Sequence, residues 1–227
     1  MLIVKGLVGG LFQVALFAVF LLVPARTWDW PRAIQFLVAY GVLVSVSIIA
    51  LAVVAPASLE ARLVAPTAKS QPLADRVASA FLFASIFGFM AFIPIDVFHL
   101  HLFPRPTFGV SVFGATLLLA GFGIMLVTLY QNAFAAPIVK DQADRGQVVI
   151  DTGLYSRVRH PFYVGIVLFL IGLALWLESY AGVLAVSLVF ASLVARIRAE
   201  EKTLRDTLPG YTEYMSKVRY RLVPGIW

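Results

Sequence analysis

The chain has 227 residues, of which 61% are hydrophobic and only 13% are charged, and its mean hydropathy is +0.91. This composition excludes a soluble enzyme or binding module and predicts an integral membrane protein. The net charge of +6 does not indicate nucleic-acid binding, because the basic residues flank apolar runs and form no nucleic-acid motif. The absence of cysteine excludes disulfides, a thiol nucleophile and any thiolate metal site.

The first half of the chain contains four apolar runs, at residues 6–23, 33–55, 77–95 and 108–130. Each is close to the length of about 20 residues that a helix needs to cross a bilayer core. The first run lacks a small-x-small cleavage site, so we expect a transmembrane helix rather than a signal peptide. Residues 56–76 mix charges with prolines, which favours an exposed loop or a short interfacial helix.

The second half begins with the longest polar stretch, residues 131–160, which must lie outside the lipid or line a cavity. Residues 162–195 are then apolar except for Glu178 and Ser179. A run of about 34 residues is too long for one span, so it predicts a hairpin of two helices that turns near Glu178. The fold class is therefore all-α, a polytopic membrane bundle of five or six transmembrane helices.

Basic residues predict the orientation of this bundle. With six spans, all but three of the 18 Lys and Arg residues fall on one side, and Arg26, Arg32 and Arg105 fall on the other. The richer side is predicted to be cytoplasmic. Both termini and the polar stretch before the hairpin then face the cytoplasm.

Arg159 and His160 stand directly before Pro161, a residue favoured at the first position of a helix. His160 is therefore expected at a helix mouth, where free N–H groups and the helix dipole suit an anion. Tyr163 lies three residues further on and is expected on the same face. The alternative is that Arg157 and Arg159 only anchor the helix at the lipid headgroups.

Glu200 and Glu201 follow the last apolar arm. Adjacent helical residues point about 100° apart, so the two carboxylates are expected to have different roles. Glu201 precedes Arg205 by four residues, which predicts a helical ion pair. Glu200 is the preferred functional candidate, against the alternative of a solvated helix face.

These features together resemble the isoprenylcysteine carboxyl methyltransferase family and, more loosely, the phospholipid methyltransferases. The resemblance extends over residues 128–227, which it identifies as the catalytic region, and leaves residues 1–127 as N-terminal transmembrane helices. Leu208, Pro209 and Gly210 directly before the tail tyrosine depart from the eukaryotic pattern and favour a prokaryotic member, in a bacterial inner membrane. The matching positions are Gly153, Tyr155, Arg159, His160, Pro161, Tyr163, Gly165, Arg196, Glu200, Glu201, Tyr211 and Tyr214.

The resemblance implies methyl transfer from S-adenosylmethionine, bound on the cytoplasmic side, to a lipophilic acceptor drawn from the membrane. A prenylcysteine-like carboxylate is the expected acceptor. No metal and no nucleic acid are implied. Carried over by position, the cofactor-binding residues would be Tyr155, His160, Tyr163, Glu200 and Glu201, and the catalytic residues would be Arg159, Arg196 and Glu200.

The residue types suit that chemistry. A helix mouth with His160 can hold the carboxylate of the cofactor, and Glu200 can hold its ammonium. A carboxylate acceptor needs no general base, whereas an amine or a thiol would need His160 or Glu200 to take a proton. Two alternatives stay open, an NADPH-dependent reductase of the sterol type and a transporter or assembly protein without chemistry. A transporter would carry polar residues in mid-membrane, whereas the polar clusters here lie at one face.

Overall fold

The computed structural model describes residues 1–63, 73–134 and 147–227, and within these ranges it contains helices and no strand. In this described part of the chain, five helices are long and apolar enough to cross a membrane, and α6 is a shorter apolar helix of 16 residues. The predicted all-helical membrane bundle is confirmed. Its six long elements are α1 (Leu2–Ala25), α2 (Pro31–Val54), α4 (Leu73–Ile95), α5 (Phe108–Gln131), α6 (Pro161–Trp176) and α7 (Tyr180–Thr207).

Four short helices complete the described chain. Within residues 56–76 the structure has a helix, α3, which agrees with the short helix expected there; residues 64–72 lie outside the described ranges, as do residues 135–146 of the long polar stretch. The short helices are α3 (Pro56–Arg62), the π-helix η1 (Asp96–Leu100), the 3₁₀-helix η3 (Gly153–Ser156) and α8 (Tyr211–Lys217).

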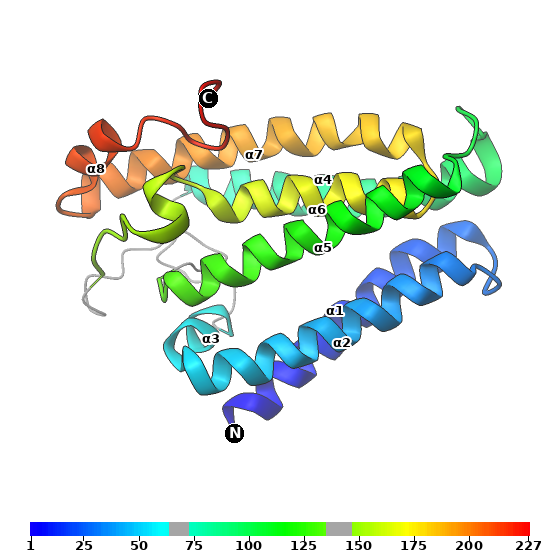
Figure 1. Ribbon diagram of the computed structural model, residues 1–227, viewed down its shortest axis with the longest axis horizontal. Coiled ribbons are helices and arrows are strands. Elements are labelled where there is room, and N and C mark those ends of the chain that lie inside the picture. Colours follow the sequence, from blue (N-terminus) through cyan, green and yellow to red (C-terminus); the bar gives the residue numbers. More distant parts are fainter. Residues whose placement is uncertain (64–72, 135–146) are drawn as a thin grey trace.

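The bundle has two chemically distinct ends (Figure 1). The N-terminus, α3 and α8 lie at one end, and the connections from α1 to α2 and from α6 to α7 lie at the other. At this second end, Glu178 pairs with Arg32 at 3.0 Å and with Arg105 at 3.8 Å. Two of the three basic residues that were predicted to share the poorer side therefore meet there.

The predicted hairpin is confirmed as α6 and α7, and its turn is at Glu178, which has a φ of +66°. The next residue caps α7, because the Ser179 hydroxyl accepts a hydrogen bond from the Gly182 N–H at 2.8 Å. The same hydroxyl donates to the buried carboxylate of Asp96 at 2.6 Å. This network links the turn to η1 and determines where α6 ends and α7 begins.

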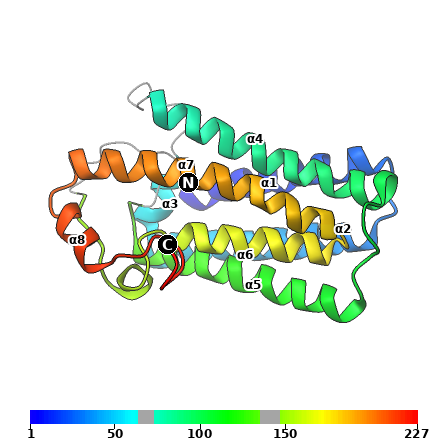
Figure 2. The same cartoon turned by 90° about the horizontal axis from the view of Figure 1, so that it is seen from above.

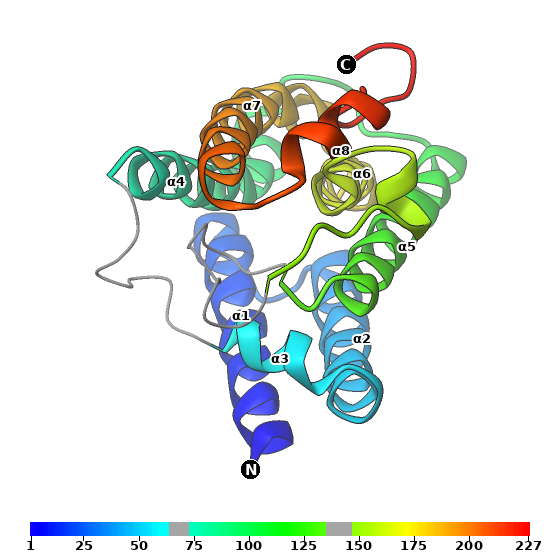
Figure 3. The ribbon, with the colours of Figure 1, turned by 90° about the vertical axis from the view of Figure 1, so that its left-hand side faces the viewer.

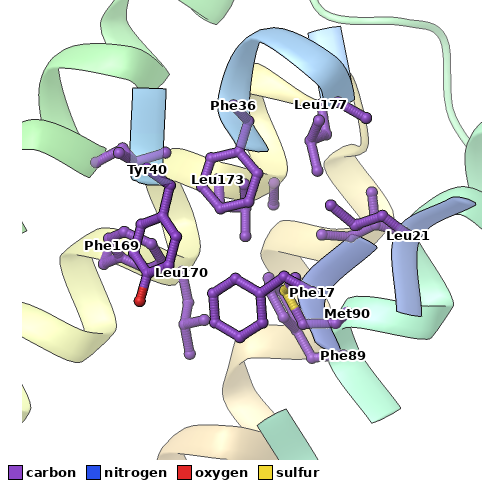
Figure 4. Close-up of a cluster of buried hydrophobic side chains, with 14 of the residues drawn as sticks. Phe17, Leu21, Phe36, Tyr40, Phe89, Met90, Phe169, Leu170, Leu173 and Leu177 are labelled. Carbon is purple, nitrogen blue, oxygen red and sulfur yellow. The ribbon is translucent and has the colours of Figure 1, made fainter. Parts of the chain in front are cut away.

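The core lies where α1, α2, α4, α5, α6 and α7 meet, and Figure 4 shows part of it. It combines aliphatic side chains with a group of packed rings. Phe17 of α1 stacks on Tyr40 of α2 at a centroid distance of 5.1 Å, and Tyr40 contacts Phe169 of α6 at 5.8 Å. Such ring contacts add to the packing energy in the bundle interior. Large apolar side chains such as Val8, Val42 and Phe113 point outward instead, as expected of helices that face lipid.

Helices α5 and α6 approach each other closely along a seam of four glycines. A Cβ on Gly121 would lie 2.5 Å from the Gly165 carbonyl oxygen, and one on Gly172 would lie 2.3 Å from the Leu118 nitrogen. Gly114 and Gly165 are equally restricted. Small residues at such positions allow two backbones to touch, which is how membrane helices gain packing energy. The seam fixes α5 against the helix that carries the His160 motif.

We expect Gly121→Ala to destabilise the protein by about 1–3 kcal/mol, because the new methyl group would overlap backbone atoms of α6 that cannot rotate away. Thermal unfolding of the purified protein in detergent measures the effect. Gly123→Ala is the matched control on the same helix, since a Cβ there would meet nothing within 4 Å. Equal unfolding temperatures for the two variants would contradict the glycine seam.

Candidate active site

A cavity of about 220 Å³ is lined by residues at the end of the bundle that carries α3 and α8. Figure 3 views the helices from this end. The cavity wall combines residues at the ends of α3, α6 and α7 with residues of α8, η3 and α4 and with residues 147–150. Chain segments distant in sequence therefore converge here. The polar lining residues are Arg62, Ser79, Asn132, Gln147, Arg159, His160, Arg196 and Glu200, and the aromatic ones include Tyr155, Phe162, Tyr163, Tyr211 and Tyr214.

His160 occupies the predicted helix mouth. It is the N-terminal cap of α6, with a non-helical φ of −127°, and Pro161 is the first residue of the helix. The backbone N–H groups of Arg159 and His160 donate to the carbonyls of Tyr220 and Arg221, both at 3.0 Å. Figure 2 shows the C-terminal tail returning over the start of α6. The tail thereby holds the helix mouth in place.

The carboxylate of Glu201 lies at the centre of a buried charge cluster. Its Oε1 accepts from Arg159 Nε at 2.8 Å and lies 3.2 Å from His160 Nε2, while its Oε2 accepts from Arg221 Nε at 2.9 Å. The Arg159 guanidinium also donates to the carbonyls of Val218 and Arg219. Glu201 is 2% exposed, so its contacts with Arg159, His160 and Arg221 take the place of the hydrogen bonds that its carboxylate would make with water.

Glu200 faces the cavity. Its Oε2 accepts a hydrogen bond of 2.7 Å from the Tyr163 hydroxyl. The ring of Tyr163 stacks on His160 at a centroid distance of 5.7 Å, which brings the imidazole and this carboxylate onto one wall. Arg196 lies one helical turn before Glu200, is buried, and lines the same cavity. The structure thus brings His160, Tyr163, Arg196 and Glu200 together.

Tyr155 lines the cavity from η3. Its hydroxyl accepts from Asn132 Nδ2 at 3.0 Å, and its carbonyl accepts from the Tyr214 hydroxyl of α8 at 2.8 Å. Burial raises the pKa of the Tyr155 phenol to about 12, so the group stays protonated at neutral pH. Gly153, with a φ of +59°, permits the turn that precedes it. Gln131 secures this turn, because its Oε1 accepts from the Leu154 N–H at 3.0 Å.

These contacts correct one sequence expectation, the ion pair between Glu201 and Arg205, and they place two expected site residues, Glu201 and Arg159, in a buried charge cluster. Glu201 was expected to pair with Arg205, but its carboxylate binds Arg159, His160 and Arg221, and Arg205 reaches only its backbone carbonyl. Among the described residues, Glu201 is not part of the cavity lining, whereas His160, which its carboxylate contacts, is. Arg159 lines the cavity, yet its guanidinium faces Glu201 and the tail. Long-range pairing has replaced the local ion pair.

Arg62, at the end of α3, is a cavity residue that the sequence did not reveal. Its guanidinium carbon lies 4.9 Å from the centre of the Phe162 ring, within the range of a cation–π contact. The only local signal was a basic residue at the end of a short amphipathic stretch. Arg221 was likewise unpredicted as a partner of Glu201. Within the described ranges, no group of three or more His, Asp or Glu side chains is arranged to hold a metal ion.

Comparisons with known proteins show what this chain is similar to. The family model described as phospholipid methyltransferase matches residues 110–209. Protein-S-isoprenylcysteine O-methyltransferase of Saccharomyces cerevisiae is 31% identical over 111 residues, which are 48% of this chain and 46% of that protein. The cobalt-zinc-cadmium resistance protein CzcN of Cupriavidus metallidurans is 35% identical over 71 residues, 31% of this chain and 33% of that protein. The chain thus spans less than half the length of either relative.

The resemblance inferred from the sequence is confirmed by these matches. The family match covers most of α5 and all of η3, α6 and α7, and so includes every predicted site residue. The predicted boundary between residues 127 and 128 stays a prediction, because the family match begins inside α5.

Proposed function

We propose that this membrane protein, which matches the phospholipid methyltransferase family model over residues 110–209, is a methyltransferase that transfers a methyl group from S-adenosylmethionine to the carboxylate of a lipophilic, prenylcysteine-like acceptor. The observation that carries the proposal is the Glu200 carboxylate on the cavity wall, held by Tyr163 beside His160 at the mouth of α6. The family match favours this function over the reductase and transporter alternatives.

The residues present fit the proposed cofactor. The cavity combines the Glu200 carboxylate with the rings of Tyr155, Tyr163, Tyr211 and Tyr214, and both kinds of group attract cations. Glu200 would hold the ammonium group, and the mouth of α6 at His160 would hold the carboxylate. When bound, S-adenosylmethionine supplies a methyl group made electrophilic by its sulfonium. Glu201 would act through His160, as a positioning residue rather than as a direct contact.

The proposed reaction requires the protein to align the acceptor carboxylate with the methyl group, and it requires no proton transfer. An acceptor carboxylate oxygen forms the new bond to the methyl carbon while the carbon–sulfur bond breaks, so opposite charges cancel and no proton leaves. Arg196 is proposed to orient that carboxylate, because it is buried at the cavity wall one turn from Glu200. Apolar lining residues, among them Leu82 and Ile166, would exclude water and strengthen these electrostatic contacts.

The proposed location follows from where the cavity lies. It opens at the end of the bundle that includes α3 and α8, near the N-terminus and away from Arg32 and Arg105. The positive-inside rule would make this end cytoplasmic, and in a prokaryote the membrane would be the inner membrane. A water-soluble cofactor would enter from the cytoplasm, while the acceptor would arrive through the lipid.

We expect the purified protein to bind S-adenosylmethionine and to transfer labelled methyl groups to N-acetyl-S-farnesylcysteine as a base-labile ester. Glu200→Gln should weaken cofactor binding about tenfold or more, because the loss of a charge-assisted contact costs about 1.5–3 kcal/mol. Calorimetry measures binding, and release of labelled methanol by base measures ester formation.

Glu213→Gln is the matched control, because Glu213 is exposed on α8 and does not line the cavity. It should leave both measurements unchanged. Absence of cofactor binding by the wild-type protein would contradict the proposed function, and so would binding that Glu200→Gln leaves intact. A base-stable product would instead assign the methyl group to nitrogen or sulfur and contradict the carboxylate acceptor.

A further inference from the structure

The C-terminal tail, residues 219–227, turns back along α7 after α8 (Figure 1). The ring of Trp227 meets the ring of Phe190 on α7 edge-on, at a centroid distance of 6.4 Å. Phe190 belongs to the stretch 180–195, which has no charged residue and lies in a candidate membrane span. The tail therefore returns from the polar end of the bundle to the apolar part of α7.

The position of Phe190 on α7 indicates the depth of this contact. Arg198 is exposed on the same helix, and an exposed guanidinium belongs at the headgroups or in water rather than among acyl chains. Phe190 precedes Arg198 by eight residues, which is about 12 Å along the helix axis. Leu184 and Leu188 are also exposed on α7 and continue this apolar surface. The Trp227 ring thus lies on the lipid side of the level that Arg198 marks.

The backbone of the tail is closed on itself, as a segment in contact with lipid requires. The N–H groups of residues 221–223 donate to the backbone oxygen of Trp227 at 2.9, 3.0 and 3.1 Å. The N–H groups of Ile226 and Trp227 donate to the carbonyl of Val223, both at 3.1 Å. These bonds take the place of those that water would make, and without them irregular backbone is excluded from lipid.

The side chains of this turn divide into an inward and an outward set. Leu222 is buried, and the Arg221 guanidinium turns toward the protein, where it binds Glu201. Val223 and Ile226 point outward, with exposed fractions of 44% and 80%. Two branched apolar side chains next to a lipid-facing helix surface fit hydrocarbon, because the hydrophobic effect favours their removal from water.

We propose that the C-terminal tail is an interfacial anchor, which inserts Val223 and Ile226 among the acyl chains of the leaflet at the cavity end of the bundle. Its partner is the lipid itself, at the depth of about 5–10 Å into the headgroup and acyl boundary that apolar interfacial segments reach. The tail carbonyls that accept from the N–H groups of Arg159 and His160 belong to the same segment. Lipid contact is thereby linked to the mouth of α6, and this link does not depend on the proposed methyl transfer.

The test uses the absence of cysteine from the chain, so that one introduced cysteine carries one nitroxide label. Ile226→Cys is labelled in the full-length protein, which is reconstituted into vesicles of phosphatidylethanolamine and phosphatidylglycerol. Collisions of the label with oxygen, which concentrates in lipid, are compared with collisions with a water-soluble nickel chelate. We expect oxygen to dominate, and we expect the resulting depth to be about 5–10 Å below the phosphates.

Two matched positions calibrate the measurement. Leu188→Cys places the label on the exposed apolar surface of α7 and should report lipid. Glu213→Cys places it on the exposed surface of α8 and should report water. The label in Ile226→Cys should resemble the first. Each labelled protein should keep the helical content of the wild type by circular dichroism, and if Ile226→Cys does not fold, Val223→Cys replaces it on the same outward surface.

Two results would overturn the proposal. Access of the nickel chelate to Ile226→Cys equal to its access to Glu213→Cys would place the tail in water. Strong spin–spin coupling between the labels of two copies, removed by dilution with unlabelled protein, would place a second copy rather than lipid on the tail. Failure of the proposed function has a separate signature, the absence of S-adenosylmethionine binding, and would leave the label in lipid.

Discussion

Glu201→Ala is expected to destabilise the protein by about 3–5 kcal/mol, the cost of removing one partner from a buried ion pair. The side chains of Arg159 and His160 are 4% and 5% exposed, so water cannot replace the carboxylate that they share. Arg159 would keep its contacts with the Val218 and Arg219 carbonyls, but its charge would be uncompensated. Thermal or denaturant unfolding in detergent measures the change.

The size of the effect should follow burial within the cluster. Arg221 is 29% exposed, so Arg221→Ala should cost no more than about 1 kcal/mol, as is usual for exposed pairs. Exposed Glu213→Ala on α8 should have no measurable effect. A double-mutant cycle between Arg159→Met and Glu201→Gln should show strong coupling, because each single change leaves the other group buried. Additive effects, or a Glu201→Ala variant as stable as the wild type, would contradict the cluster.

The helices of this protein were predictable because the membrane leaves the sequence few alternatives. Four apolar runs became α1, α2, α4 and α5, with ends within a few residues of those expected, because backbone polar groups in lipid must be satisfied within a helix. The turn at Glu178 was also predictable, since it is the only charged interruption of its run. The π-helix η1 was not foreseen, because no sequence period marks a single turn of that kind.

The candidate site was predictable only where a local rule applied. Pro161 set the start of α6 and so identified the position of His160, and the angle between adjacent helical residues separated Glu200 from Glu201. Local rules failed for Glu201, whose partners are 20 to 42 residues away in the sequence, and for Arg62, which meets Phe162 across two helices. Such contacts depend on how the bundle packs, and helix periodicity does not encode that.

Removal of residues 219–227 is the second change expected to have a large effect, a loss of S-adenosylmethionine affinity of about tenfold or more. The backbone N–H groups of Arg159 and His160 would lose the Tyr220 and Arg221 carbonyls, and a buried N–H without a partner costs about 1–3 kcal/mol. Glu201 would also lose Arg221. His160 would then no longer be held at the mouth of α6, where we propose that it contacts the cofactor.

The core of the bundle should survive this truncation, because its buried side chains come from α1, α2, α4, α5, α6 and α7 and not from the tail. Calorimetric titration with S-adenosylmethionine therefore has to be compared with helical content by circular dichroism, and only the first should change strongly. Trp227→Ala is the matched control: it removes the ring contact with Arg221 but keeps the backbone carbonyls of the tail. Wild-type affinity in the truncated protein would show that the mouth of α6 is ordered without the tail.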